Sequence, residues 1–425
     1  MTQALTPSRS TQNVRRHVLD NGIVILVTEN PAADIIATRL FLGTGTRWEP
    51  PGKSGLSHLL ATVLTKGTER LTSLDIAERV ESVGARLSAD TSADYFLMGL
   101  KTVSSDFAEI LDLAAQLLRS PSFPEAEIEL ERRITIQGIR SQREQPFSLA
   151  FEGLRRAMYG DHPYAISTYG TEETVSQLTR DDLQQFHQTY FRPDNLIISL
   201  AGRITLTEAI AHIDRVFGDW PAPAEPPPEP VLPDVSPDPH KAICPLATQQ
   251  SVIMLGYLAG SVRHPDYAGL KLMNTYLGNG LSSRLFVELR EKRGLAYDVS
   301  AFYPTRLDAS QFVVYMGTAP QNTAIAIEGL RAEVVRLADV PLSEEELQVS
   351  KNKLLGQYAL GKQTNTQLAQ IYGWYEILGL GIDFDRQFQA DVMAVTAAEV
   401  QAIAQKNFVE PYLSLVGPEA IVSQF

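Results

Sequence analysis

Two stretches of the chain carry the continuous apolar pattern of a buried β-strand, residues 35–42 and residues 251–258. Each is followed by a polar loop and then by a helical pattern, which begins near Gly55 in the first case and near Ala268 in the second. Strands that come first and helices that follow are typical of an α+β fold. We therefore predict a mostly antiparallel sheet with helices packed on one face.

The order of these elements repeats along the chain. In each half a helix ends at a glycine, Gly84 or Gly294, and glycine suits the left-handed backbone at a helix C-terminus. The two glycines lie 294 − 84 = 210 residues apart. Long amphipathic helices are then predicted at residues 106–118 and 323–337. The repeat predicts two homologous domains of similar topology.

A proline-rich segment separates the two halves. Proline has no N–H for a strand ladder and breaks helix interiors, so this segment should be an extended connector. We predict a first domain over residues 14–220, a linker over residues 221–240 and a second domain over residues 241–425. Nine prolines mark the linker: Pro221, Pro223, Pro226, Pro227, Pro228, Pro230, Pro233, Pro237 and Pro239.

Composition and charge exclude several classes of protein. The net charge of −13 argues against nucleic acid as a partner, because phosphate binding needs clustered Lys and Arg. Cys244 is the single cysteine, which excludes a disulfide framework and a cysteine-rich metal site. Apolar runs such as residues 22–27 fall far short of the roughly 18 residues of a membrane-spanning helix. We expect a cytoplasmic protein without a membrane partner.

The start of the chain has the composition of a disordered arm. Residues 1–16 carry three arginines and no acidic residue. They lack the apolar stretch of a secretory signal. We interpret them as a short disordered arm before the fold.

The helical segment after Gly55 carries the most informative motif of the first half. Its sequence from His58 is His-Leu-Leu-Ala-Thr. The segment resembles the zinc motif His-x-x-Glu-His of the inverzincin peptidases, the family of pitrilysin, insulinase and mitochondrial processing peptidase. In that motif two histidines on one helix face bind zinc, and the glutamate is the general base for the metal-bound water.

This chain departs from the motif at every position except the first. His58 is present, but Ala61 stands at the general-base position and Thr62 at the second-ligand position. The resemblance places the third ligand at Gly138, seven residues after Glu131. A zinc site needs three or four protein ligands, so we predict no metal in this chain. His58 is then a relic or a structural histidine, and Glu131 an ordinary helix carboxylate.

The second half carries a longer match to the same family. Residues 283–297 read Ser-Arg-Leu-Phe-Val-Glu-Leu-Arg-Glu-Lys-Arg-Gly-Leu-Ala-Tyr. The resemblance implies that Arg290 and Tyr297 reach the scissile peptide and stabilise the oxyanion that forms on it. The alternative makes Arg290 a solvated helix residue and Tyr297 a core aromatic. The length of the motif favours the functional interpretation. His162, before a proline in a turn-like stretch, is interpreted as structural.

Loss of the zinc motif with retention of the Arg/Tyr pair indicates one kind of family member. The resemblance implies a heterodimeric metalloendopeptidase, in which a homologous partner subunit holds zinc and this chain supplies Arg290 and Tyr297 in trans. It also implies two domains that form half of a clam-like chamber for unfolded peptides. The alternative is a catalytically inert scaffold or peptide-binding homologue. A homodimer of the isolated chain is a further expectation.

Overall fold

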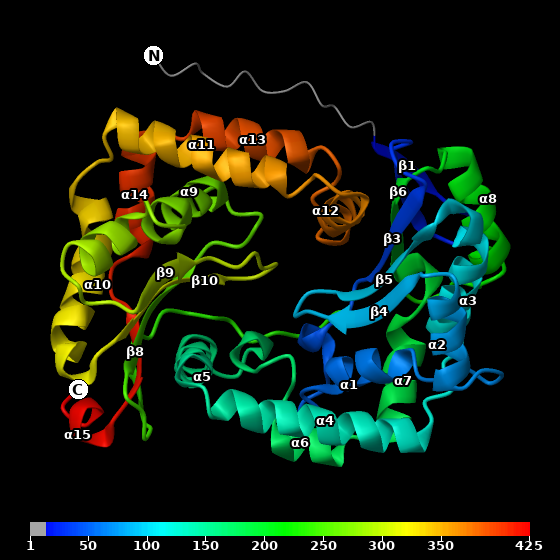
Figure 1. The fold of residues 1–425 in the computed structure, drawn as a ribbon, viewed down its shortest axis with the longest axis horizontal. Helices are drawn as coiled ribbons and strands as arrows, with labels where there is room; N and C mark the ends of the chain where they lie inside the picture. The colour runs from blue at the N-terminus through cyan, green and yellow to red at the C-terminus, as the bar shows by residue number, and fades with distance from the viewer. Residues whose placement is uncertain (1–13) are drawn as a thin grey trace.

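Two β-sheets form the framework of the protein (Figure 1). The structure is a computed structural model, and it describes residues 14–425. Residues 1–13 of the predicted disordered arm lie outside this range. The first sheet has the strand order β1-β2-β6-β3-β5-β4 and the second has the order β7-β11-β8-β10-β9.

The first sheet is antiparallel except between β2 and β6. The second is antiparallel except between β7 and β11. In spatial order, strands β2-β6-β3-β5-β4 of the first sheet therefore match strands β7-β11-β8-β10-β9 of the second sheet in position and direction. The bounds are β1 Val14–Val18, β2 Val24–Glu29, β3 Ile35–Leu42, β4 Arg86–Thr91, β5 Phe96–Val103, β6 Leu196–Gly202, β7 Lys241–Pro245, β8 Ser251–Ala259, β9 Asp298–Phe302, β10 Ser310–Thr318 and β11 Tyr412–Gly417.

Helices connect the strands in both halves. Those of the first half are α1 Leu56–Leu64, α2 Ser73–Ser82, α3 Phe107–Arg119, α4 Glu125–Arg143, α5 Pro146–Tyr159, α6 Glu172–Gln177, α7 Arg180–Tyr190 and α8 Leu206–Phe217. Those of the second half are α9 Tyr267–Gly278, α10 Thr323–Asp339, α11 Glu344–Leu360, α12 Asn365–Ile377, α13 Phe384–Ala394, α14 Ala397–Asn407 and α15 Glu419–Val422. The short turns are η1 Thr46–Trp48, η2 Ser104–Asp106, η3 Pro163–Ala165, η4 Pro193–Asn195 and η6 Pro320–Asn322, and η5 Phe286–Glu291 is a π-helix.

The predicted α+β architecture with two similar sheets is confirmed. The structure adds an exchange of helices between the halves. Helix α12, from the second half, packs on β3 and β6 of the first sheet, and α5, from the first half, packs on β8 and β11 of the second sheet (Figure 1). Each sheet therefore has its own helices on one face and a helix of the other half on the opposite face.

Close contacts hold the exchanged helices against their sheets. A Cβ atom added to Gly373 of α12 would lie 2.3 Å from a ring carbon of Phe41 on β3. Likewise, one added to Gly256 of β8 would lie 2.6 Å from the sulfur of Met158 on α5. Glycine at these two positions lets helix and sheet approach closely.

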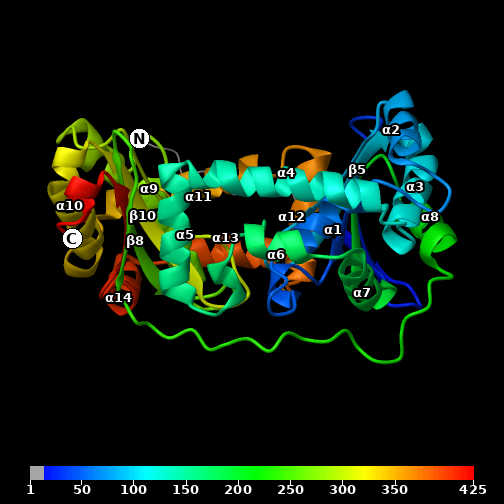
Figure 2. The same cartoon turned by 90° about the horizontal axis from the view of Figure 1, so that it is seen from below.

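The proline-rich segment runs as a long extended connection along one side of the molecule (Figure 2). Between Phe217 and Lys241 the chain forms no helix or strand. The buried guanidinium of Arg192 donates to the carbonyl oxygens of Pro223 and Glu225, and the hydroxyl of Tyr412 accepts from the Asp238 N–H. The segment is thus attached to both halves. The exact domain boundaries stay a prediction, because α5 and α12 cross between the sheets.

No helix in the described part of the chain is long and apolar enough to cross a membrane.

Candidate functional site

Helix α1 carries the zinc-like motif, and the half-buried carboxyl group of Glu49 holds its first turn. Glu49 accepts hydrogen bonds from the backbone N–H groups of Gly55, at 3.0 Å, and Ser57, at 2.8 Å. A carboxyl group here accepts hydrogen bonds from free N–H groups at the start of the helix. Burial raises the pKa of Glu49 to about 8, while the hydrogen bonds from Ser57 and Gly55 oppose the rise. Gly55 has φ +93°, and a Cβ there would lie 2.6 Å from the carbonyl oxygen of Tyr169.

The ring of Tyr169 lies between two of the positions that the resemblance assigns to zinc ligands. Its centroid is 4.4 Å from that of His58. A Cβ added to Gly138 would be in ordinary contact with it, 3.8 Å from Cε1 of Tyr169. Burial lowers the pKa of His58, and Asp90 and Glu131 oppose this shift. His58 therefore contacts an aromatic ring where the family motif has a metal.

The other motif positions are also used for packing or pairing. Ala61 is buried in the core of the first half. The Thr62 hydroxyl donates to the carbonyl oxygen of Leu59 at 2.9 Å. Glu131, which the sequence analysis treats as an ordinary helix carboxylate, is buried and forms an ion pair with Lys66 at 2.8 Å. Among residues 14–425 no group of three His, Cys, Asp or Glu side chains could hold a metal ion. The residues present do not fit a zinc ion.

Arg290 and Tyr297 lie in the second half, apart from α1. Arg290 is part of η5, and π-helical turns are frequent at functional sites. Its exposed guanidinium lies 4.9 Å from the centroid of the Phe286 ring. Tyr297 precedes β9, is 62% exposed, and is held by its backbone N–H, which donates to Gly317. In the described part of the chain neither side chain forms a hydrogen bond or an ion pair within the protein.

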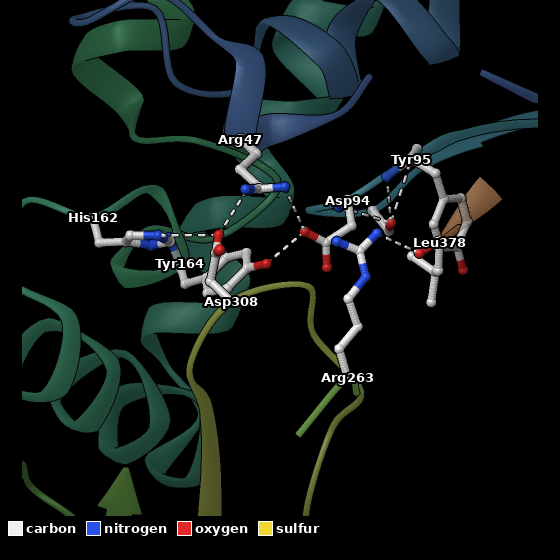
Figure 3. Close-up of polar contacts among 9 residues, drawn as sticks. Arg47, Asp94, Tyr95, His162, Tyr164, Arg263, Asp308 and Leu378 are labelled. Atoms are coloured by element: carbon white, nitrogen blue, oxygen red, sulfur yellow. Dashed lines mark hydrogen bonds and ion pairs between the residues drawn. The ribbon is translucent and has the colours of Figure 1, made fainter. Parts of the chain in front are cut away.

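A polar network joins the two halves near their centre (Figure 3). Asp308, in the loop between β9 and β10, lies 2.8 Å from Nε of Arg47 and 3.6 Å from Nε2 of His162. The nearby His162 ring and the charge of Arg47 hold the pKa of Asp308 below its usual range, although burial opposes this shift. The hydroxyl of Tyr164 donates to Asp94, which lies 3.9 Å from Arg47. The network therefore connects the β9–β10 loop to three separate segments of the first half.

His162, for which the sequence predicts a structural role in a local turn, faces two segments with its two ring nitrogens. Its Nδ1 accepts from the Tyr164 N–H at 3.1 Å, which caps η3, while its other ring nitrogen faces Asp308. Tyr169 is not predicted from the sequence as a residue of this site. The one available signal was its neighbour Gly170, which has φ +76° and packs on Ser54.

Two family profiles together match most of the chain. Residues 24–172 match the family described as Insulinase (Peptidase family M16), and residues 177–354 match the Peptidase M16 inactive domain. The chain belongs to the M16 peptidase family. The family resemblance predicted from the sequence motifs is therefore confirmed.

Curated relatives of this M16 chain are named as uncharacterized zinc proteases. One from Bacillus subtilis is 28% identical over 409 residues, which cover 95% of this chain and 98% of the relative. One from Streptomyces coelicolor is 27% identical over 413 residues, covering 95% and 90%.

Solved structures share the fold of the M16 chain. The peptidase M16 inactive domain from Pseudomonas fluorescens aligns with a TM-score of 0.87 at 23% identity, covering 96% of this chain and 98% of that one. A protease from Helicobacter pylori aligns with a TM-score of 0.90 at 21% identity, covering 96% and 100%. The protein is thus an M16 peptidase-like chain whose residues 177–354 match the domain described as inactive.

Proposed function

We propose that this chain is the non-zinc subunit of a heterodimeric metalloendopeptidase that degrades or processes peptides. The observation that carries the proposal is the state of Arg290 and Tyr297, whose polar groups are exposed and have no hydrogen-bond or ion-pair partner within the described chain. A side chain kept for stability is usually buried or paired, whereas one that serves a substrate needs free donors. The degenerate motif around His58 supports the assignment of zinc to another subunit.

The proposed chemistry divides one active site between two chains. The homologous partner would hold zinc and supply the nucleophilic water. In this chain, Arg290 would bind the carbonyl of an extended, unfolded peptide substrate, and the Tyr297 hydroxyl would donate a hydrogen bond to the developing oxyanion. Because charge develops on that oxygen in the transition state, both donors should affect turnover more than binding.

The alternative is an inert scaffold or peptide-binding homologue. It predicts that Arg290 and Tyr297 can be replaced without loss of activity in any assembly that contains this chain. A homodimer of the isolated chain is compatible with both proposals. A cytoplasmic location, without nucleic acid or membrane as a partner, belongs to the proposal and rests on the acidic composition and the single cysteine.

The test mixes this chain with an M16 homologue from the same organism that has an intact zinc motif. We expect peptide cleavage by the mixture and none by this chain alone. Arg290→Ala should reduce turnover by about 100-fold or more, the usual range for loss of an oxyanion donor. Tyr297→Phe, which removes only a hydroxyl, should have a smaller effect.

Size-exclusion chromatography of each mixture separates a loss of chemistry from a loss of assembly. Arg143→Gln, a change at an exposed arginine on α4, is a matched control and should leave turnover unchanged. Full activity from the Arg290→Ala, Tyr297→Phe double variant would establish the scaffold alternative. Metal analysis that finds about one zinc per isolated chain would contradict the assignment of zinc to the partner.

A further inference from the structure

Part of the first sheet is not covered by the exchanged helix α12. This helix packs on β2, β6 and β3, on the face that carries Phe41. Helices α1 to α3 pack on β4 and β5 from the opposite face. On the α12 side, the outer strands β5 and β4 therefore present a face that no described helix covers (Figure 1). This face adjoins the strands on which α12, the helix from the second half, packs.

Three cations gather on this uncovered face. Strand register places Arg39 opposite Gly99, and Gly99 opposite Ser88. In the next row, Lys101 of β5 lies opposite Arg86 of β4. Residues that face each other in an antiparallel pair point to the same side, so all these side chains share the face of Phe41.

The guanidinium of Arg39 lies across the strand next to its own. A Cβ added to Gly99 would be 2.0 Å from Nη1 of Arg39, so the guanidinium occupies the space that this glycine leaves empty. The Ser88 hydroxyl is 3.5 Å from the same Cβ position. Arg39 thus reaches from β3 toward the edge strand β4, where Arg86 and Lys101 are exposed.

None of the three cations is neutralised within residues 14–425. No carboxylate oxygen comes within 4 Å of the side-chain nitrogens of Arg39, Arg86 or Lys101, and none of them forms a side-chain hydrogen bond, in contrast to the many paired cations of this chain. Nε of Arg39 is buried without a partner, and burial lowers the pKa of this guanidinium. Like charges directly opposite each other, such as Lys101 and Arg86, destabilise a sheet. In a chain of net charge −13, an unpaired cluster of Arg39, Arg86 and Lys101 is suited to bind an anion from outside the chain.

We propose that Arg39, Arg86 and Lys101 form a binding site for carboxylate groups of an acidic peptide segment. The proposal rests on the proposed function, which makes peptides the ligands of this chain, and it adds a preference for acidic sequences. Strand β4 is the edge of the sheet, so an extended peptide can pair with it and place alternate side chains over the cations. Asp90, four residues after Arg86 on the same strand and face, would disfavour a carboxylate at that end of the site.

The acidic charge of the whole protein disfavours nucleic acid at this site. A site of three cations on a chain of net charge −13 lacks the extended basic surface that phosphate backbones need. On an extended peptide, acidic side chains two residues apart lie about 7 Å from each other. The pairing of Gly99 with Arg39 and the pairing of Lys101 with Arg86 are also two residues apart along β5, so the two spacings match.

The test uses the full chain and two fluorescent twelve-residue peptides without secondary structure. One carries three Glu residues at alternate positions and the other carries Gln at the same positions. Fluorescence anisotropy measures the dissociation constants at low and at moderate NaCl concentration. At low salt we expect the Glu peptide to bind about tenfold more tightly than the Gln peptide, with the preference decreasing as salt screens the charges.

Variants locate the preference on this face. Arg86→Gln with Lys101→Gln removes two exposed cations and should reduce the preference to about threefold or less. The control, Arg386→Gln with Lys406→Gln, makes the same change in net charge at exposed positions of α13 and α14 and should keep the full preference. Arg39→Gln tests whether the half-buried guanidinium of Arg39 contributes to the preference for the Glu peptide. Circular dichroism confirms that each variant is folded.

Several outcomes would overturn the proposal. These are equal binding of the two peptides, no binding of the Glu peptide up to about 1 mM, an equal loss of preference in the control, or tighter binding of a twelve-residue single-stranded oligonucleotide. The activity test of Arg290 and Tyr297 uses a neutral peptide substrate. A failure of the acidic preference therefore leaves the proposed function intact, and a failure of the activity test leaves the measured preference in place.

Discussion

Two histidines show how their surroundings determine the chemistry of a side chain in this protein. His58 lies half-buried against the Tyr169 ring, and among residues 14–425 no second metal ligand stands beside this one surviving residue of the zinc motif. His187 on α7 is buried, and its Nε2 donates to the carbonyl oxygen of Leu118 at 2.8 Å. Burial lowers the pKa of His187 to about 4, while the hydrogen bond to Leu118 opposes the shift.

His187 should make the protein less stable in acid. Its folded pKa of about 4 lies below the usual value of 6.5, so the unfolded chain binds the proton more readily. The contribution of neutral His187 to the free energy of unfolding is fully present above pH 6.5. It is lost as the pH falls from 6.5 toward 4, and the total loss is about 3 kcal/mol. His187→Gln keeps an N–H donor and cannot titrate. Urea unfolding of both proteins at several pH values should show a smaller loss for the variant, and parallel pH profiles would contradict this assignment.

At the scale of the elements, the packing of α12 on the first sheet explains a glycine that looks unfavourable in the sequence. A glycine inside a helix normally costs about 1 kcal/mol relative to alanine. Gly373 is tolerated in α12 because a side chain there would overlap Phe41 of β3. Apart from its own helix backbone and its chain neighbours, Gly356 in α11 has no described atom within 4 Å of its Cβ position. The same residue type therefore has a packing role in one helix and none in the other.

These two glycines give opposite predictions for the same substitution. Gly356→Ala should stabilise the protein by about 0.5–1 kcal/mol, because only helix propensity changes. Gly373→Ala should destabilise it by about 1–3 kcal/mol, because the added methyl group overpacks the contact with the first sheet. Thermal and urea unfolding measure both. Stabilisation by both substitutions would show that α12 does not pack on the sheet as described.

At the scale of the whole molecule, the halves are joined by the exchanged helices, the proline-rich segment and the network around Asp308. Arg47 is mostly buried at this junction, and Asp308 is its closest carboxylate (Figure 3). Removal of one partner of a mostly buried pair leaves a charge without compensation. The network therefore contributes to the relative position of the halves.

Asp308→Asn tests this contribution. We expect a loss of about 1–3 kcal/mol in the free energy of unfolding, since Arg47 keeps only the more distant Asp94. Asp383→Asn breaks an exposed pair with Arg386 and should cost about 0–1 kcal/mol. Because the pKa of Asp308 is lowered, its contribution is present at neutral pH and is lost as the pH falls through the folded pKa. Equal effects of the two substitutions would contradict the proposed role.

Local patterns were sufficient to predict several of the elements and the family. The apolar run at residues 35–42 coincides with β3, and the run at residues 251–258 falls within β8. The predicted helices near Gly55 and Ala268 are α1 and α9. These predictions succeed because periodicity and turn residues act between near neighbours in the chain. The motif around Arg290 and Tyr297 likewise spans fifteen residues without a gap.

Contacts between distant segments were decided only by the tertiary structure. The ring of Tyr169 beside His58, the pair of Arg47 and Asp308, and α12 on the first sheet join residues that are more than 100 positions apart. No local pattern encodes such pairs, because burial and charge compensation depend on which surfaces meet after the chain has folded. The sequence by itself therefore determined several strands and helices and showed which positions of the zinc motif lack a ligand. The folded arrangement decided what occupies the empty motif and leaves the cations of the first sheet without partners, since both depend on packing across the two halves.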